Sequence, residues 1–421
     1  MSRLALLGGP PAIAQPPPHF TWPPIDERTE QAVLRQLRTS ISIYDRSGVI
    51  AELEDALCAY HGVRHALLTS SGTAALYSMY AGAGIQPGDE VIAPAYTFFA
   101  TVTPLLHLGA IPVLVDCDHT GNMDPLAAAQ RITPKTRAIV VTHMWGLPAN
   151  MAPFRELANK HGLLLFEDGS HAHGARLNGQ LVGTFGDAAA FSMNGPKTLS
   201  AGEGGFILTN RDDIFHGALM HGQYNKRCRN EIPSDSPLHP FAVTGMGLKH
   251  RIHPLAAAIG LEQLRRLDEY LDGRQQIAAQ LCEQLGEVRG IEVPVLIPGS
   301  RPSWYGLSLR YRAEELGGLS IDRFHQALTA EGCHELDRPR STCPLNLHPA
   351  LQMPESLWPS MAGQFIYRPR DFPLAEALHG ELLRLTVWHR ASDFSLASRY
   401  VAAFQKAVQR HPELLGDEDD R

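Results

Sequence analysis

Seven short apolar segments recur between residues 65 and 208, and helical candidates or loops separate them from one another. They are residues 65–69, 90–93, 111–115, 137–141, 162–166, 188–192 and 205–208. Short apolar runs are typical of strands buried on both faces, and strands that alternate with helices favour a parallel sheet. The sequence therefore predicts an α/β domain with a seven-stranded, mostly parallel sheet covered by helices on both faces.

Two charged residues stand where such a sheet can bind a ligand. The run 162–166 ends in Glu167 and Asp168, at the strand edge where open α/β sheets bind their ligands. A carboxylate held there needs a cationic partner to remain ionised, and a protonated pyridine nitrogen is one such partner. Lys197 lies five residues after Ser192, next to Pro196, where desolvation would make its amine nucleophilic. Taken alone, either charged residue is more often a solvated surface group.

Two further stretches also allow more than one interpretation. Ser71, Gly72 and Thr73 follow the first apolar run and open a helix, whose free N–H groups favour a phosphate. The same residues also make an ordinary helix cap. Phe98 follows the second apolar run, and a phenylalanine there is either a ring that stacks on a ligand or a core residue.

Together these motifs resemble the DegT/DnrJ/EryC1/StrS family of pyridoxal-phosphate-dependent sugar aminotransferases. The matching segments are Glu167-Asp168, Ser192-Met193-Asn194-Gly195-Pro196-Lys197, Ala201-Gly202-Glu203-Gly204-Gly205, Ser71-Gly72-Thr73 and Pro94-Ala95-Tyr96-Thr97-Phe98. The resemblance covers roughly residues 30 to 400 and is densest from 66 to 260. It implies the type I pyridoxal-phosphate aminotransferase fold, with a seven-stranded sheet and a smaller C-terminal α+β domain, and pyridoxal 5'-phosphate as the cofactor.

The resemblance also implies a role for each matching residue. Lys197 would carry the Schiff base and move the proton during transfer, while Asp168 would hold the pyridinium nitrogen. The remaining cofactor contacts would be Ser71, Gly72, Thr73 and Ser192 at the phosphate, Phe98 stacked on the ring, and His171 near the 3-hydroxyl group. The family often has Gln at the position of His171, and a related subgroup that performs dehydration has His in place of the lysine. Lys197 argues against that dehydration chemistry.

Lys249 stands where the family usually has an asparagine, in the segment Gly247-Leu248-Lys249-His250-Arg251. In the family that asparagine reaches the cofactor phosphate of the neighbouring subunit. An ammonium group can also meet a phosphate, as a point charge. We therefore expect a homodimer with shared active sites, in which Arg251 either makes a similar contact or caps a helix.

For function, the resemblance implies transfer of an amino group from glutamate, glutamine or alanine to a keto sugar or cyclitol ketone, in aminosugar, aminocyclitol or antibiotic biosynthesis. Residues 6–9 resemble the opening of members that act on cyclitols. The polar loop 221–230 is expected within reach of the site, where it would bind acceptor hydroxyls, or else is merely solvated. Two alternatives stay open: another pyridoxal-phosphate reaction such as elimination or a carbon–carbon bond change, and a regulatory relative without catalysis.

We predict that the chain has four regions. They are an N-terminal arm (1–30), a large domain (31–260), a connecting helix (261–289) and a small domain (290–421). Proline enrichment to residue 27 favours an extended arm laid over the body or a neighbour. Apolar spacing predicts helices at 26–37, 49–60, 253–285 (weakened at Gly273), 321–330 and 395–408, and strands at 307–311 and 383–388. The polar, proline-containing segment 221–247 is predicted to be a long loop, and the acidic tail 416–420 is predicted to be disordered.

Composition excludes several classes of partner. The formal net charge is −7 and no Lys/Arg-rich run occurs, so we expect no nucleic-acid binding. No apolar stretch approaches the roughly 20 residues of a membrane helix, and the apolar start of the chain is broken at Gly8-Gly9-Pro10-Pro11, too early for a signal peptide. The six cysteines lack C-x-x-C spacing and the histidines lack zinc-site spacing, so we expect a cytoplasmic protein without a metal site.

Overall fold

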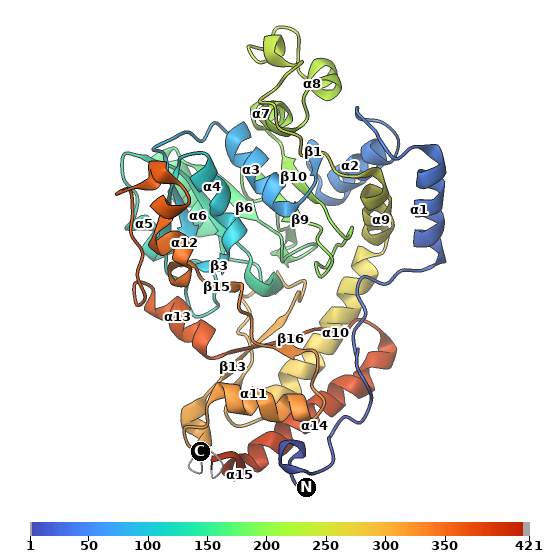
Figure 1. Ribbon diagram of the computed structural model, residues 1–421, viewed down its shortest axis with the longest axis vertical. Coiled ribbons are helices and arrows are strands. Elements are labelled where there is room, and N and C mark those ends of the chain that lie inside the picture. The colour runs from blue at the N-terminus through green and yellow to red at the C-terminus, as the bar shows by residue number, and fades with distance from the viewer. Residues whose placement is uncertain (1, 416–421) are drawn as a thin grey trace.

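The computed structural model describes residues 2–415, and Figure 1 shows two lobes stacked along its long axis. The upper lobe contains a seven-stranded sheet of β1 (His65–Thr69), β2 (Glu90–Pro94), β4 (Ile111–Val115), β5 (Thr136–Thr142), β6 (Leu164–Asp168), β9 (Ala188–Ser192) and β10 (Gly205–Thr209). The strand order is β1-β10-β9-β6-β5-β2-β4. Only β10 runs antiparallel to its neighbours, so the predicted mostly parallel α/β sheet is confirmed.

Helices cover both faces of this sheet. Along β5, Ala138 and Val140 pack in one hydrophobic core with the helices α3 (Gly72–Gly82) and α7 (Asp212–Gly222). Ile139 and Val141 face the opposite core, which holds α6 (Met151–His161). Beside it, α2 (Gly48–His61) and α9 (Pro254–Arg265) cover β1, β9 and β10. Burial on both faces explains the unbroken apolar runs in the sequence.

Parallel pairing brings three strand ends to one edge of the sheet. Thr142 at the end of β5 lies opposite Asp168 at the end of β6, and Asp168 lies opposite Ala190 in β9. The chain then leaves β9 at Ser192, and β1 leads directly into the first turn of α3. This edge of the sheet positions the functional site.

The lower lobe has a four-stranded sheet in the order β11 (Ile291–Glu292), β13 (Leu307–Tyr311), β16 (Leu382–Leu385) and β14 (Leu336–Asp337). The helices α10 (Leu267–Gly286), α11 (Ile321–Ala330) and α14 (Phe394–Gln409) pack against it. The predicted strand 383–388 is too long at its end, because Leu385 already pairs with the first residue of β13, Leu307. No residue of β13 remains to pair with 386–388.

Two other predictions also need correction. The segment 221–247 is not one long loop, since α7 extends to Gly222 and α8 spans Lys226–Glu231. The buried Arg227 stabilises α8 by pairing with Glu231, four residues later, and with Glu54. The helical stretch 253–285 breaks at Arg266, not at Gly273. Gly273 lies inside α10. Only glycine fits at this position, because a Cβ atom there would lie 1.8 Å from the carbonyl oxygen of His389.

The N-terminal arm lies along both lobes (Figure 1). Leu4 and Ile13 belong to the core of the lower lobe, whereas Trp22 reaches the upper lobe. In the other direction, residues of 345–382 pack in a core of the upper lobe, and β15 (Thr342–Pro344) pairs with β3 (Tyr96–Phe98). The division at residues 30, 260 and 289 therefore stays a prediction.

The other helices and strands are α1 (Glu27–Thr39), α4 (Thr103–His107), α5 (Pro125–Ala129), α12 (Pro349–Gln352), α13 (Pro373–Gly380), α15 (His411–Leu415), β7 (Arg176–Leu177), β8 (Gln180–Leu181) and β12 (Ser300–Arg301). The predicted acidic tail 416–420 lies outside the described residues. Within residues 2–415, no helix combines the length and the apolar character needed to cross a bilayer.

Candidate active site

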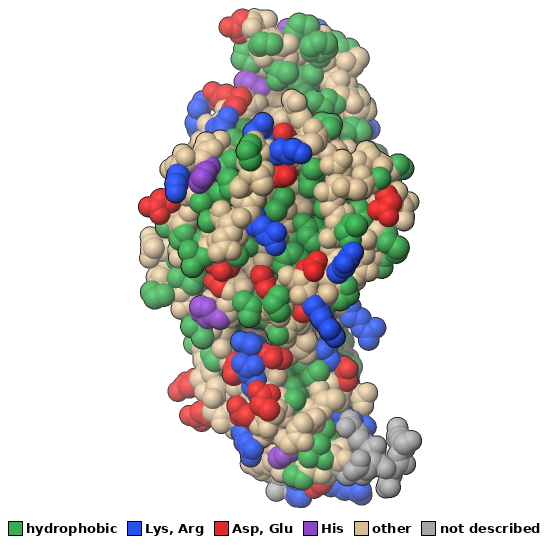
Figure 2. Space-filling view, turned by 90° about the vertical axis from the view of Figure 1, so that its left-hand side faces the viewer, with side chains coloured by type: hydrophobic (Ala, Val, Ile, Leu, Met, Phe, Trp, Pro, Cys, Tyr) green, Lys and Arg blue, Asp and Glu red, His purple; other side chains and the backbone are tan. Residues whose placement is uncertain are grey.

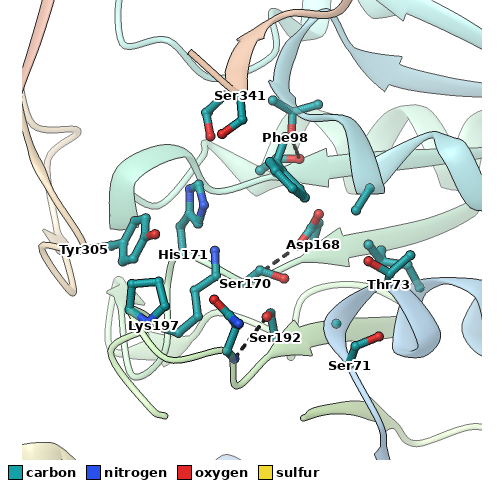
Figure 3. Close-up of a pocket in the computed structure, with 18 of the residues that line it drawn as sticks. Ser71, Thr73, Phe98, Asp168, Ser170, His171, Ser192, Lys197, Tyr305 and Ser341 are labelled. Carbon is teal, nitrogen blue, oxygen red and sulfur yellow. Dashed lines mark hydrogen bonds between the residues drawn. The ribbon is translucent and has the colours of Figure 1, made fainter. Parts of the chain in front are cut away.

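A cavity of about 400 Å³ opens at the edge of the sheet where β5, β6 and β9 end (Figure 3). Eight of the residues singled out from the sequence line it: Ser71, Gly72, Thr73, Phe98, Asp168, His171, Ser192 and Lys197. They come from β3, β6, β9, the start of α3 and the loops after β6 and β9. The sheet topology thus gathers motifs that lie up to 126 residues apart in the sequence.

Asp168 is a buried carboxylate, with 4% of its surface exposed. Its Oδ2 accepts a hydrogen bond from Thr101 Oγ1 at 2.8 Å, and its Oδ1 accepts one from the Ser170 main-chain N–H at 3.1 Å. No lysine, arginine or histidine among residues 2–415 forms an ion pair with it. Asp168 therefore retains acceptor capacity toward the cavity.

Its neighbour Glu167 is different. The carboxylate of Glu167 accepts main-chain N–H bonds from Gly183, Phe185 and Gly186 at 2.7–2.8 Å. His143 Nε2 donates a further bond at 3.1 Å, because its Nδ1 already accepts the Ala149 N–H. The Glu167 side chain is fully buried, and protein donors satisfy its carboxylate. Its role is therefore structural.

Lys197 is half-buried on the loop after β9, and its ammonium lies 4.7 Å from the centre of the Tyr305 ring. Its main-chain N–H donates to Asn194 O at 2.9 Å, and its carbonyl oxygen accepts from Trp22 Nε1 at 2.7 Å. Among the described residues that line the cavity, Lys197 is the only lysine or arginine. In Figure 3 its side chain points into the cavity between His171 and Ser170.

His171 is buried and stacks on Tyr305 with ring centres 4.4 Å apart, and its ring centre is 5.4 Å from that of Trp145. Desolvation lowers the pKa of His171 well below its usual value, and the charges of Lys197 and Arg384 lower it further. Its Nδ1 has no hydrogen-bond partner among residues 2–415. A neutral imidazole with an unused nitrogen is thus available to a bound ligand.

The start of α3 and the end of β9 form a cradle. Ser71 Oγ accepts the Ala74 N–H and caps the helix, while the N–H groups of Gly72 and Thr73 come earlier in the first turn and have no acceptor within the helix. A Cβ atom on Gly72 would lie 2.5 Å from Ser192 Cβ, so glycine is required for this close approach. Main-chain N–H groups and the Ser192 hydroxyl can together bind an anion such as a phosphate. The cap and the anion site therefore coexist.

Some predicted positions do not line the cavity. Gln223 instead donates to Leu68 O, and Arg227 pairs with two glutamates, so the expectation that loop 221–230 lies at the site is wrong for its own subunit. As the chain turns into α8, the side chains of Gln223 and Arg227 bind other parts of the fold and do not reach the cavity. Lys249 is exposed and outside the cavity, and Arg251 lies over the rings of Tyr44 and Tyr224, at 5.4 and 5.5 Å. Arg251 does not cap α9, whose N-cap is His253.

Other cavity residues escaped the sequence analysis. Tyr305, Ser341 and Thr342 line the cavity from the chain after residue 300, and Thr101 orients Asp168 without lining the cavity itself. These four residues belong to no local motif. Only Thr142 carried a signal, because it ends an apolar strand next to that of Asp168.

Comparison with known proteins gives a consistent result. Residues 24–398 match the DegT/DnrJ/EryC1/StrS aminotransferase family. The L-glutamine:2-deoxy-scyllo-inosose aminotransferase of Streptomyces kanamyceticus is 33% identical over 98% of this chain and 98% of its own. The GDP-perosamine synthase of Caulobacter vibrioides is 37% identical over 61% of this chain and 67% of its own. The structure of DesV from S. venezuelae superimposes with a TM-score of 0.75 at 29% identity, over 91% of this chain and 94% of that chain. The chain therefore belongs to the DegT/DnrJ/EryC1/StrS aminotransferase family and is a pyridoxal-phosphate-dependent aminotransferase, as its sequence motifs predict.

Proposed function

We propose that this enzyme binds pyridoxal 5'-phosphate in the cavity at the sheet edge and transfers an amino group from an amino acid to a keto sugar or cyclitol ketone. One observation carries the proposal: Asp168, a buried carboxylate without a cationic partner among residues 2–415, shares a cavity with the amine of Lys197. The donors considered are glutamine, glutamate and alanine. The name of the S. kanamyceticus relative favours glutamine as donor and a cyclitol as acceptor.

The residues present fit the cofactor. Asp168 would hold a protonated ring nitrogen, the first turn of α3 at Ser71, Gly72 and Thr73 would bind the phosphate with Ser192, and Phe98 would lie on the ring. His171, with its unused Nδ1, would meet the 3-hydroxyl group. The bound cofactor supplies an electron sink for the carbanion that forms when the donor loses its α-proton.

The protein supplies binding, orientation and proton transfer. Asp168 would keep a proton on the ring nitrogen of the cofactor, and Thr101 fixes the Asp168 carboxylate through the 2.8 Å hydrogen bond. Lys197 would hold the cofactor covalently through Nζ in the resting enzyme. When an amino donor takes its place, the freed amine would accept the proton from the donor α-carbon as a base and give it up again as an acid. The same residues would act in the reverse order to aminate the acceptor ketone.

The lining of the cavity favours a neutral, hydroxylated acceptor. Hydroxyl and amide groups of Ser170, Asn194 and Ser341 lie on its wall, while none of the described lining residues is an arginine. None of the described lining residues therefore offers the second carboxylate clamp that an oxo diacid requires. Polar groups of this kind match a cyclic polyol by hydrogen bonds.

The test uses purified enzyme loaded with pyridoxal phosphate. Borohydride reduction should fix the cofactor on the peptide that contains Lys197, and an adduct on another lysine would overturn the assignment. Glutamine alone should convert the cofactor to its amine form, which an elimination enzyme or a non-catalytic relative would not accumulate. A cyclitol ketone or keto sugar should then reoxidise that form much faster than pyruvate or oxaloacetate. Faster turnover with the oxo acids would contradict the proposed acceptor.

We further propose that the active unit is a homodimer with shared sites, to which Lys249 contributes. The exposed Lys249 lies close in sequence to Phe241, Val243 and Met246, which are 60%, 57% and 57% exposed. Apolar side chains gather on this projecting end of the upper lobe (Figure 2), and such a patch is typical of a protein–protein contact. Mixing Lys197→Ala with Lys249→Ala subunits should restore some activity through hybrid dimers. Full subunit exchange without recovery would exclude a shared site.

A cytoplasmic location is part of the same proposal. All six cysteines lie within the described residues and are free thiols, as is usual for proteins of reducing compartments. Fractionation of the producing cells, with the enzyme detected by antibody, would test it. Recovery in the culture medium or the membrane fraction would contradict it.

A further inference from the structure

Trp22 of the N-terminal arm contacts the loop after β9 that carries Lys197. Its indole Nε1 donates to the carbonyl oxygen of Lys197 at 2.7 Å. The ring is held edge-on by Tyr270 and His389, at centroid distances of 5.2 and 5.4 Å. Trp22 therefore fixes the main chain of Lys197 from outside the cavity, which it does not line.

Arg274, from α10, lies against Trp22, with its Cζ 4.5 Å from the centre of the Trp22 ring. Its side chain is only 2% exposed, and its Nε has no hydrogen-bond partner among residues 2–415. No carboxylate in that part of the chain forms an ion pair with it, and burial lowers its pKa to about 10. A cation buried in this way is costly, and the aromatic face of Trp22 offsets part of the cost.

The same guanidinium also binds the segment that carries Tyr305. Arg274 Nη1 donates to the carbonyl oxygen of Trp304 at 2.8 Å, and Trp304 Nε1 donates to Gln275 Oε1 at 3.0 Å. Trp304 has a φ of 53°, in the left-handed region that a tryptophan adopts only when its surroundings enforce it. The next residue is Tyr305, whose ring lies 4.7 Å from Lys197 Nζ.

The arm itself is anchored on the lower lobe, so that Trp22 is not a loose end. The carboxylate of Glu331 accepts the main-chain N–H groups of Ala5 and Ala12, each at 2.8 Å, and pairs with Lys406. Further along the arm, Glu335 accepts the N–H of His19 at 2.9 Å. These contacts fix the arm before it reaches Lys197, which reduces the entropy lost in holding Trp22 in place.

We propose that Trp22 and Arg274 are positioning residues for the transfer reaction. Trp22 sets the main chain of Lys197, and Arg274 sets both Trp22 and the peptide that carries Tyr305. Together they fix the Lys197 amine and its aromatic neighbour relative to the ring of the cofactor. The inference rests on the proposed role of Lys197. Displacements of about 1 Å in such a constellation can cost up to about a hundredfold in rate.

The test compares two Trp→Phe variants of the holoenzyme. Trp22→Phe keeps a ring over Arg274 but removes the hydrogen bond to Lys197. Trp358→Phe is the matched control, because Trp358 Nε1 donates to His107 Nδ1 at 3.4 Å and neither residue lines the cavity. We expect Trp22→Phe to lower kcat about tenfold with the donor KM changed less than about twofold. The visible circular dichroism of the bound cofactor should weaken, since it reports the orientation of the cofactor in its site.

Trp358→Phe should match wild type in both kcat and visible circular dichroism. If Trp22→Phe behaves like Trp358→Phe in these measurements, the positioning role is wrong. Should Trp22→Phe lower kcat only in proportion to a loss of folded protein, measured by thermal unfolding, the role is structural and the inference also fails.

A second variant covers Arg274. Arg274→Lys keeps the cation but cannot reach both Trp22 and the Trp304 carbonyl with a planar fork. It should reproduce the effect of Trp22→Phe, and the double variant should lose less than the product of the two single effects. Multiplicative losses would show that the residues act separately. Borohydride labelling of Lys197 keeps the two proposals distinct: labelling with unchanged kinetics refutes the positioning role alone, whereas labelling elsewhere refutes the proposed function.

Discussion

The cavity has two walls of different construction. The sheet wall presents polar groups with unused bonding capacity, such as Asp168 at the end of β6 and the Ser192 hydroxyl at the end of β9. The opposite wall is the chain around Tyr305, which the arm supports from outside the cavity, and it consists of stacked rings and of main-chain carbonyls already in hydrogen bonds. The difference teaches that the first wall carries the chemistry and the second one fixes its geometry. Changes to the first wall should therefore cost far more activity than changes to the second.

The largest effect is expected from Lys197→Ala. Loss of the amine removes both the covalent link and the proton carrier, so the transfer rate should fall by about four orders of magnitude or more. Steady-state assays with glutamine and a cyclitol ketone measure this fall. Lys160→Ala, at an exposed position of α6, is the control and should leave the rate unchanged. A Lys197→Ala enzyme within tenfold of wild type would refute the assignment.

Next in size is the contrast between two adjacent carboxylates. Asp168→Asn should lower kcat about 10²- to 10³-fold, because the ring nitrogen loses its anionic partner, while the melting temperature stays close to wild type. Glu167→Gln should instead lower stability by about 3 kcal/mol, because the change removes a buried charge that accepts four protein hydrogen bonds. Thermal unfolding and steady-state kinetics on both variants separate the two roles, and the reverse pattern would contradict them.

On the second wall, the ring of Tyr305 should matter more than its hydroxyl. Tyr305→Ala removes the ring that lies 4.7 Å from Lys197 Nζ and stacks on His171, so we expect kcat to fall about tenfold. Tyr305→Phe keeps both contacts and should stay within about threefold. A larger loss in Tyr305→Phe would mean that the phenol hydroxyl binds substrate, which would blur the distinction between the walls.

The smallest expected effect concerns pH and stability. Burial lowers the pKa of His61, beside β9 and β10, to about 4, and that of His389, beside Trp22, also to about 4. The unfolded chain therefore binds more protons than the folded one between about pH 6.5 and 4. The stability that these neutral histidines contribute is fully present above pH 6.5 and is lost as the pH falls toward 4.

The melting temperature should accordingly drop between pH 7.5 and 5. The drop should shrink in His61→Gln, where the fully buried ring accounts for at most about 3 kcal/mol, and shrink less in His389→Gln, whose ring is partly exposed. His119→Gln, in a loop of the upper lobe, is the control. Equal pH dependence in all three variants would show that other groups control acid stability.

The sequence by itself determined the sheet wall. Each strand of the large sheet is a continuous apolar run, and burial on both faces requires such runs wherever the strand lies in the sheet. The site residues follow strand ends at short spacing, as Asp168 follows β6 and Lys197 follows β9. Parallel pairing then places those ends at one edge. Local patterns and one topological rule marked Asp168 and Lys197 as candidates, and the family resemblance added Ser192 and implied the role of each.

Only the tertiary structure decided the second wall. Trp22 and Lys197 are 175 residues apart, and the proline-rich arm carries no periodicity that would say where it docks. No local motif distinguishes Arg274 from the other polar residues of its helix, and its burial follows from the packing of Trp22 and Trp304 around it. Likewise, residues 226–231 of the loop expected at the site form α8, which is stabilised because Glu54 in a distant helix binds Arg227. Such contacts depend on long-range packing and leave no local signal, whereas burial of a strand on both faces requires a run of apolar residues that is visible in the sequence.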